Sequence, residues 1–151
     1  MKKNLAETIE QSQIEELQIP AFGYELIREI LLHDILGEDS NHILYWAGKQ
    51  LARKFPLTSM DEVVSFFESA GWGYLVMEKE TQNEMELTLT GEIINRRLDL
   101  YSDSHYQLEA GFLAEQCVIQ KKFYSEAIAE IKKRSKKILF TVKWDTKDPV
   151  S

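Results

Sequence analysis

Hydrophobic and polar positions follow a helical period through the first half of the chain. From Pro20 to Gly37, charged residues alternate with apolar residues three and four positions apart, which predicts a helix. Its apolar members are Phe22, Leu26, Ile27, Ile30 and Leu31. A second helix is expected from Ser40 or Asn41, which can cap its N-terminus, to Pro56. Its stripe includes the small residues Ala47, Gly48 and Ala52, which would let a neighbouring helix approach closely.

A third helix is predicted where Ser59 and Glu62 form a capping box, and it ends at Gly71. The period then changes from 3.6 to 2. Residues 74–80 and 84–90 are expected to form two strands joined by a turn, because their side chains suit a half-buried sheet.

The remaining segments predict a short helix, a long helix and a terminal strand. Residues 91–100 suit a short helix, and the long helix begins near Tyr106. Gly111 within the long helix is expected to admit a neighbouring backbone, since glycine otherwise weakens a helix. Residues 138–144 alternate as a strand does. The residue pattern does not decide between helix and strand for the segment 125–134. Its Ala, Glu and Lys content favours helix, while its alternation favours strand.

Both ends of the chain look loosely held. We predict a mobile or loosely docked arm over residues 1–18, one domain over residues 19–146 and a frayed tail over residues 147–151. A chain of 151 residues has the usual size of one domain.

Composition limits the partners and the cellular compartment to be expected. The net charge of −7 argues against a nucleic-acid partner. The single Cys117 forbids an intramolecular disulfide and suits a reducing compartment. Lys2 and Lys3 are followed by polar residues rather than by the apolar region of a signal peptide, and no apolar run approaches the roughly 20 residues that span a bilayer. We therefore expect a cytoplasmic protein without stable membrane insertion.

Three stretches, residues 43–52, 70–75 and 108–114, carry a family resemblance. With the last two strands they resemble the YslB-like family of Bacillus-type bacteria, within the superfamily of 4-vinyl-reductase domains and the small (TRAPP) subunits of the transport-particle tethering complex. The resemblance implies an α+β fold with N-terminal helices packed on one side of a twisted antiparallel sheet of about four strands. It also implies a strand over residues 125–134. Members of that superfamily bind an apolar or small-molecule ligand in an internal pocket, or pair as dimers.

The chain departs from the chemistry of those relatives. Ile138 stands where the 4-vinyl-reductase pattern has its last cysteine, and Tyr101-Ser-Asp-Ser-His does not match the haem clamp of the related nitric-oxide sensors. Acylation of a core cysteine, as in tethering subunits, does not transfer to Cys117 because its sequence setting differs. We expect no cofactor.

The sequence contains no recognisable motif of a catalytic or metal site. Cys117 is either a nucleophile or a buried side chain that packs like a small hydrophobic residue. Its helical neighbours Leu113 and Lys121 offer no imidazole base that could deprotonate the thiol. The three histidines His33, His42 and His105 share no metal spacing, and Asp99, Asp103 and His105 suit a loop that caps and turns. We predict no metal site and no catalytic residue.

Aromatic residues supply the candidate ligand pocket. Trp72-Gly73 is either a structural corner or one wall of a pocket between helices and sheet. The predicted pocket residues are Tyr45, Trp46, Trp72, Met77, Phe112 and Cys117. One basic run reads as a solvated hairpin tip or as a contact for an anionic partner. Its members are Lys132, Lys133, Arg134, Lys136 and Lys137.

These features predict a non-enzymatic domain that binds an apolar small molecule in an internal pocket. The first alternative is a protein-interaction or homodimerisation module, in which the sheet edge and the small-residue stripe of the second helix supply the contact. The second alternative is an enzyme of a type that the sequence does not identify.

Overall fold

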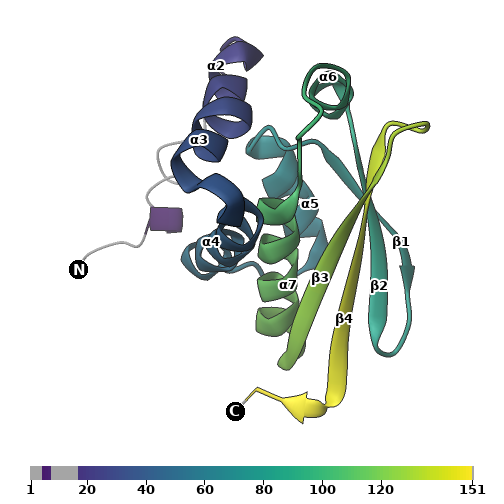
Figure 1. The fold of residues 1–151 in the computed structure, drawn as a ribbon. Helices are drawn as coiled ribbons and strands as arrows, with labels where there is room; N and C mark the ends of the chain where they lie inside the picture. Colours follow the sequence, from purple (N-terminus) through teal and green to yellow (C-terminus); the bar gives the residue numbers. More distant parts are fainter. Residues whose placement is uncertain (1–4, 8–16, 151) are drawn as a thin grey trace.

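A four-stranded antiparallel sheet lies against a set of helices on one side, in a computed structural model that describes residues 5–7 and 17–150 (Figure 1). This confirms the predicted fold class. The elements are α2 (Ala21–Glu25), the π-helix η1 (Leu26–Leu31), α3 (Leu32–Leu36), the 3-10 turn η2 (Gly37–Asp39), α4 (Ser40–Lys54), α5 (Met60–Ser69), β1 (Tyr74–Glu80), β2 (Glu84–Thr90), α6 (Glu92–Leu100), α7 (Gln107–Lys121), β3 (Phe123–Lys132) and β4 (Lys137–Pro149).

The sheet has the strand order β1-β2-β4-β3. Its inner face is apolar because alternate residues of each strand point to the helices, and Leu87 pairs with Phe140 in the centre. The ambiguous segment 125–134 lies in β3 and its turn to β4, which confirms the strand. The tail predicted to fray over residues 147–151 overlaps the end of β4, which continues to Pro149, and the Val150 amide donates to the Lys122 carbonyl oxygen at 2.8 Å.

Helices α4 and α7 cross at glycine-lined backbones. A Cβ atom on Gly48 would lie 2.1 Å from the carbonyl oxygen of Leu108, and one on Gly111 would lie 1.9 Å from that of Tyr45. No side chain fits at either position. The predicted close approach at Gly111 is therefore confirmed, and Gly48 in the small-residue stripe is its counterpart on α4.

Helix ends follow the predicted chemistry with one exception. The Ser59 hydroxyl accepts from the Glu62 amide at 3.3 Å, as in a capping box, while the Glu62 carboxylate binds Thr58. Gly37 adopts a positive φ of 67° where the first helical stretch stops. The expected cap at Ser40 or Asn41 is wrong, because η2 leads directly into α4 and Ser40 is its first residue.

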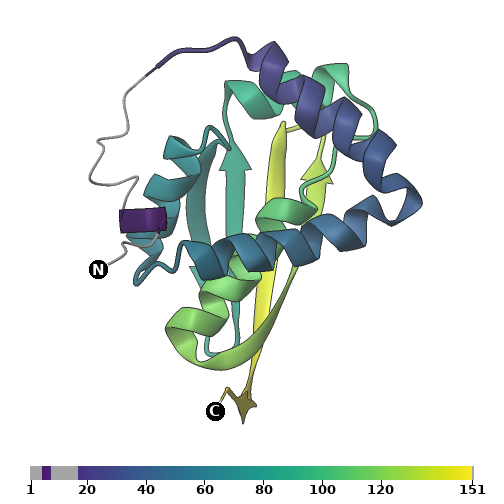
Figure 2. The same cartoon turned by 90° about the vertical axis from the view of Figure 1, so that its left-hand side faces the viewer.

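The stretch predicted as one helix from Pro20 is an α–π–α helix that packs on the outside of the helical layer, away from the sheet (Figures 1 and 2). Widened π-turns are rare and often mark functional positions. No helix in the described residues combines the length and apolar character that a bilayer span requires. The predicted arm over residues 1–18 falls mostly outside the described residues.

Candidate functional site: the outer face of the first helical stretch

The helical stretch from α2 to α3 turns its apolar side to solvent. An apolar stripe ordinarily faces the core. Here the large side chains Phe22, Leu26, Ile27, Ile30, Leu31 and Ile35 are all exposed, and Ile35 retains 73% of its accessible surface. Gly23 and Asp34 complete this exposed row, which runs about 20 Å along the helix at 1.5 Å per residue. We call these eight residues the outer stripe.

The opposite side of the same stretch buries charge. Glu25, Arg28 and Glu29 point inward and are buried. Their partners lie on α6 and α7, 68 to 81 positions away along the chain. We call the six charged residues involved the ionic cluster: Glu25, Arg28, Glu29, Arg96, Arg97 and Glu109.

Arg97 on α6 is the centre of the ionic cluster. Its side chain is 1% exposed, and its guanidinium donates to the carboxylate of Glu29 and to that of Glu109, the latter at 3.5 Å. A further N–H donates to the His105 carbonyl oxygen at 3.1 Å. The guanidinium also lies 4.2 Å from the ring centroid of Tyr106. These contacts satisfy an arginine that would otherwise be costly to bury.

Glu109 on α7 is fully buried between two arginines. Arg28 donates to one of its carboxylate oxygens and Arg97 to the other. Burial would raise the pKa of Glu109, but the charges of Arg28 and Arg97 outweigh it and hold that pKa below its usual range. Glu109 is therefore ionised at neutral pH and ties η1 to α7.

Glu25 anchors the N-terminal end of the stretch. Its carboxylate accepts from Arg96 and from the Tyr101 hydroxyl, the latter at 3.1 Å. The hydrogen bond from Arg96 keeps the pKa of Glu25 below its ordinary value despite burial. Ser104 adds a neighbouring contact, since its hydroxyl donates to Glu29 at 3.0 Å. Three carboxylates thus balance three guanidiniums.

The ionic cluster explains why the apolar side faces out. Turning the stretch about its axis would leave Arg97 and Glu109 buried without all their partners, and breaking a buried pair typically costs about 3–5 kcal/mol. The orientation is therefore set by charge pairing, and the outer stripe is its consequence.

His105 borders the ionic cluster. Its ring meets that of His33 edge to face, with 5.0 Å between centroids. Burial lowers the pKa of His105 to about 4, and the neighbouring His33 and Arg28 act in the same direction. His105 is therefore neutral at pH 7. Asp99, which the sequence placed near it, binds Lys136 instead, at 3.1 Å.

Two of the predicted pocket residues, Tyr45 and Trp46, lie on α4. The Tyr45 hydroxyl donates to the Glu126 carboxylate at 2.7 Å and accepts from the Ala127 amide at 3.0 Å. It thereby covers a free amide of the edge strand β3. Trp46 is 60% exposed. Trp46 therefore points to solvent, whereas Tyr45 packs against the core and reaches the sheet at its β3 edge.

The other four predicted pocket residues lie in or against the packed core. Trp72 and Phe112 meet edge to face at 5.3 Å within an aromatic cluster, and Met77 packs against the core from β1. Cys117 borders an enclosed space of about 10 Å³, room for about one water molecule. Burial raises the pKa of the Cys117 thiol and so favours its neutral form. This agrees with a side chain that packs like a small hydrophobic residue. Of the six residues, Cys117 alone lines that space, so ligand binding by them stays a prediction.

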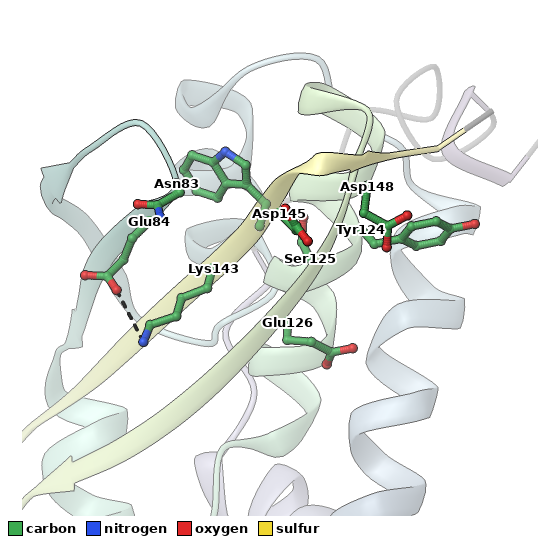
Figure 3. Close-up of a pocket in the computed structure, with 9 residues that line it drawn as sticks. Asn83, Glu84, Tyr124, Ser125, Glu126, Lys143, Asp145 and Asp148 are labelled. Carbon is green, nitrogen blue, oxygen red and sulfur yellow. Dashed lines mark ion pairs between the residues drawn. The ribbon is translucent and has the colours of Figure 1, made fainter.

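Open grooves lie on the surface of the described part, among them one beside β3 and β4 and one beside α5. One, of about 590 Å³, is acidic, and its carboxylates point in different directions while Lys143 pairs with Glu84 at 3.6 Å (Figure 3). No three acidic, histidine or cysteine side chains among the described residues could hold a metal ion. The other, of about 670 Å³, is apolar and lies beside α5, with Phe55, Leu57 and Phe66 in its wall.

The basic run lies at the turn between β3 and β4. Lys132 pairs with Glu130, and Lys136 pairs with Asp99 at 3.1 Å. Lys133 and Arg134 are exposed at the tip. This placement suits a solvated hairpin tip, and contact with an anionic partner stays a prediction.

Of the two surfaces predicted to supply a homodimer contact, the small-residue stripe of α4 is occupied within the chain and the sheet edge is covered in part at β3. Gly48 of the small-residue stripe meets the backbone of α7, and Tyr45 covers part of the β3 edge. The prediction that the small-residue stripe supplies the dimer contact is wrong, because this stripe packs inside the domain. Sequence reasoning missed the outer stripe and the ionic cluster, although Glu25, Arg28 and Glu29 share one helix face.

Comparisons with known proteins agree with the fold and the resemblance. The family model described as "Protein of unknown function (DUF2507)" matches residues 21–143. The chain is 49% identical over 137 residues to the uncharacterized protein YslB of Bacillus subtilis (strain 168), covering 91% of this chain and 93% of that protein. A vinyl-4-reductase family protein from Methanocaldococcus jannaschii has a similar structure, with a TM-score of 0.68 and 16% identity over 93% of this chain and 90% of that one.

Proposed function

The chain belongs to the DUF2507 family, and we propose that it is a protein-interaction module that pairs with a second copy of itself through the outer stripe. The observation that carries the proposal is the inverted orientation of the first helical stretch. Its charges are buried and its large apolar side chains are exposed. Contiguous exposed apolar surface on this scale marks an interaction site.

The size of the outer stripe suits a dimer contact. At roughly 200 Å² for a fully exposed large side chain, its six apolar members present about 600 Å². A standard interface buries about 800 Å² per partner. Ile43 and Trp46 on α4 are also exposed, and we propose that they supply the remainder.

Charge favours a protein partner over a membrane. Helices that lie on anionic membranes place Lys and Arg beside their apolar face. The outer stripe carries Asp34 and no basic residue, and the next exposed charges along the chain are Glu38 and Asp39. The whole chain carries −7. An anionic bilayer would repel this face, whereas an apolar row fits a second copy of itself.

Native mass spectrometry of freshly purified protein distinguishes this proposal from the ligand-binding prediction. We expect a species of about 35 kDa, twice the 17.6 kDa of one chain, without additional bound mass. A monomer carrying a small apolar molecule would overturn the proposal and support ligand binding instead. A bare monomer at micromolar concentration would overturn both.

A further inference from the structure

The exposed positions of the outer stripe are spaced symmetrically along the helix. Its exposed positions are 22, 23, 26, 27, 30, 31, 34 and 35. This set reads the same in both directions about its midpoint, between residues 28 and 29. A two-fold axis through that midpoint would place each member opposite another member of the stripe on the second copy.

We propose that two copies pair with their first helical stretches antiparallel about this midpoint. Phe22 then lies opposite Ile35, Leu26 opposite Leu31, and Ile27 opposite Ile30. The inference rests on the proposed function, because it assigns the geometry of the same contact.

The position of Asp34 selects this register over a parallel one. Asp34 is the one charged residue of the stripe, and Gly23 is the one residue without a side chain. The antiparallel register sets Asp34 opposite Gly23, where a Cβ atom would meet nothing within 4 Å and the carboxylate of the second copy meets no apolar side chain. A parallel register would set Asp34 against its own copy, and like charges repel.

Disulfide cross-linking tests the register. Cys117 is replaced by alanine in every variant, so that the introduced thiol is the only one. Phe22→Cys and Ile35→Cys are made on separate chains, one of them carrying a mass tag, and are oxidised alone and mixed. Positions 22 and 35 lie about 20 Å apart along the helix.

The mixture should give at least about tenfold more covalent dimer than either variant alone, because a disulfide requires Cα atoms within about 7 Å. Cross-linking of the Phe22→Cys chain with itself would overturn the antiparallel register while leaving the pairing intact. No covalent dimer from chains that still sediment as dimers would also overturn the register. A monomeric wild-type chain would overturn the proposed function itself.

A matched charge pair at Gly23 gives a second, independent readout. Gly23→Lys should tighten the dimer a few-fold, since it faces Asp34 of the second copy at an exposed site. Gly23→Asp should weaken it by a similar factor. Dissociation constants come from sedimentation equilibrium, and a shift of both variants in the same direction contradicts the register.

Discussion

The α4–α7 crossing and the first helical stretch hold the same domain together by opposite means. At the crossing, backbones meet at Gly48 and Gly111, where a Cβ atom would lie 2.1 Å or less from a carbonyl oxygen. The first helical stretch instead attaches through long charged side chains, with its apolar residues in solvent.

The surfaces at the α4–α7 crossing are buried within the domain, whereas the outer stripe remains exposed. Small residues at the crossing serve packing within one chain and present nothing to a partner. The ionic cluster fixes the helix without using its apolar side, which leaves the outer stripe available. A helix needs no apolar inward face to be part of a domain if its charges are paired.

Removing the centre of the ionic cluster should have the largest effect. Arg97→Met leaves Glu29 and part of Glu109 buried without their cation, and we expect a loss of about 3–5 kcal/mol in the free energy of unfolding, measured in urea. The matched control is Arg53→Met, which removes an exposed arginine paired with Glu115 and should cost about 1 kcal/mol or less. Equal losses would show that the ionic cluster does not hold the stretch.

A methyl group at the crossing should have the next largest effect. Gly111→Ala forces the α4 and α7 backbones apart, and we expect a loss of about 3 kcal/mol by thermal or urea unfolding. Gly23→Ala is the matched control on a helix, where nothing lies within 4 Å, and it should be neutral or slightly stabilising. An unchanged Gly111→Ala protein would mean that the crossing is looser than described.

Acid should destabilise the domain through His105 before it reaches the carboxylates. The folded-state pKa of about 4 lies below the ordinary 6.5, so the unfolded chain binds the proton first. The stability that His105 contributes is present above pH 6.5 and is lost as the pH falls toward 4. Between pH 6.5 and 4.5 the loss should reach about 2 kcal/mol. His105→Gln, which cannot take up the proton, should flatten this slope, and an identical slope would contradict the assignment.

The smallest effect on the single chain is expected at the outer stripe. Ile27 is exposed, so Ile27→Glu should change the free energy of unfolding of the monomer by no more than about 0.5 kcal/mol, measured under dilute conditions. A loss of several kcal/mol would place Ile27 in the core and remove the contrast between the two regions.

Hydrophobic periodicity predicted most elements because it depends on local spacing. The alternation at Leu87 and Leu89 and the capping box at Ser59 and Glu62 were sufficient for their strand and helix. The orientation of the first helical stretch could not be read in this way. The partners of Arg28 and Glu29 lie on α6 and α7, and a single sequence does not reveal that pairing. Trp72 and Phe112 lie together in the core and Tyr45 packs against it, while Trp46 points to solvent, because aromatic composition does not indicate direction.

Sedimentation equilibrium on three chains at micromolar concentration shows whether the outer stripe joins two copies. Ile27→Glu lies in the outer stripe, and Ile128→Glu introduces the same charge at a comparably exposed position on β3. Pairing through the outer stripe predicts about 35 kDa for the wild type and for Ile128→Glu, and 17.6 kDa for Ile27→Glu. A wild type of 17.6 kDa, or a dimer that survives Ile27→Glu, would contradict it.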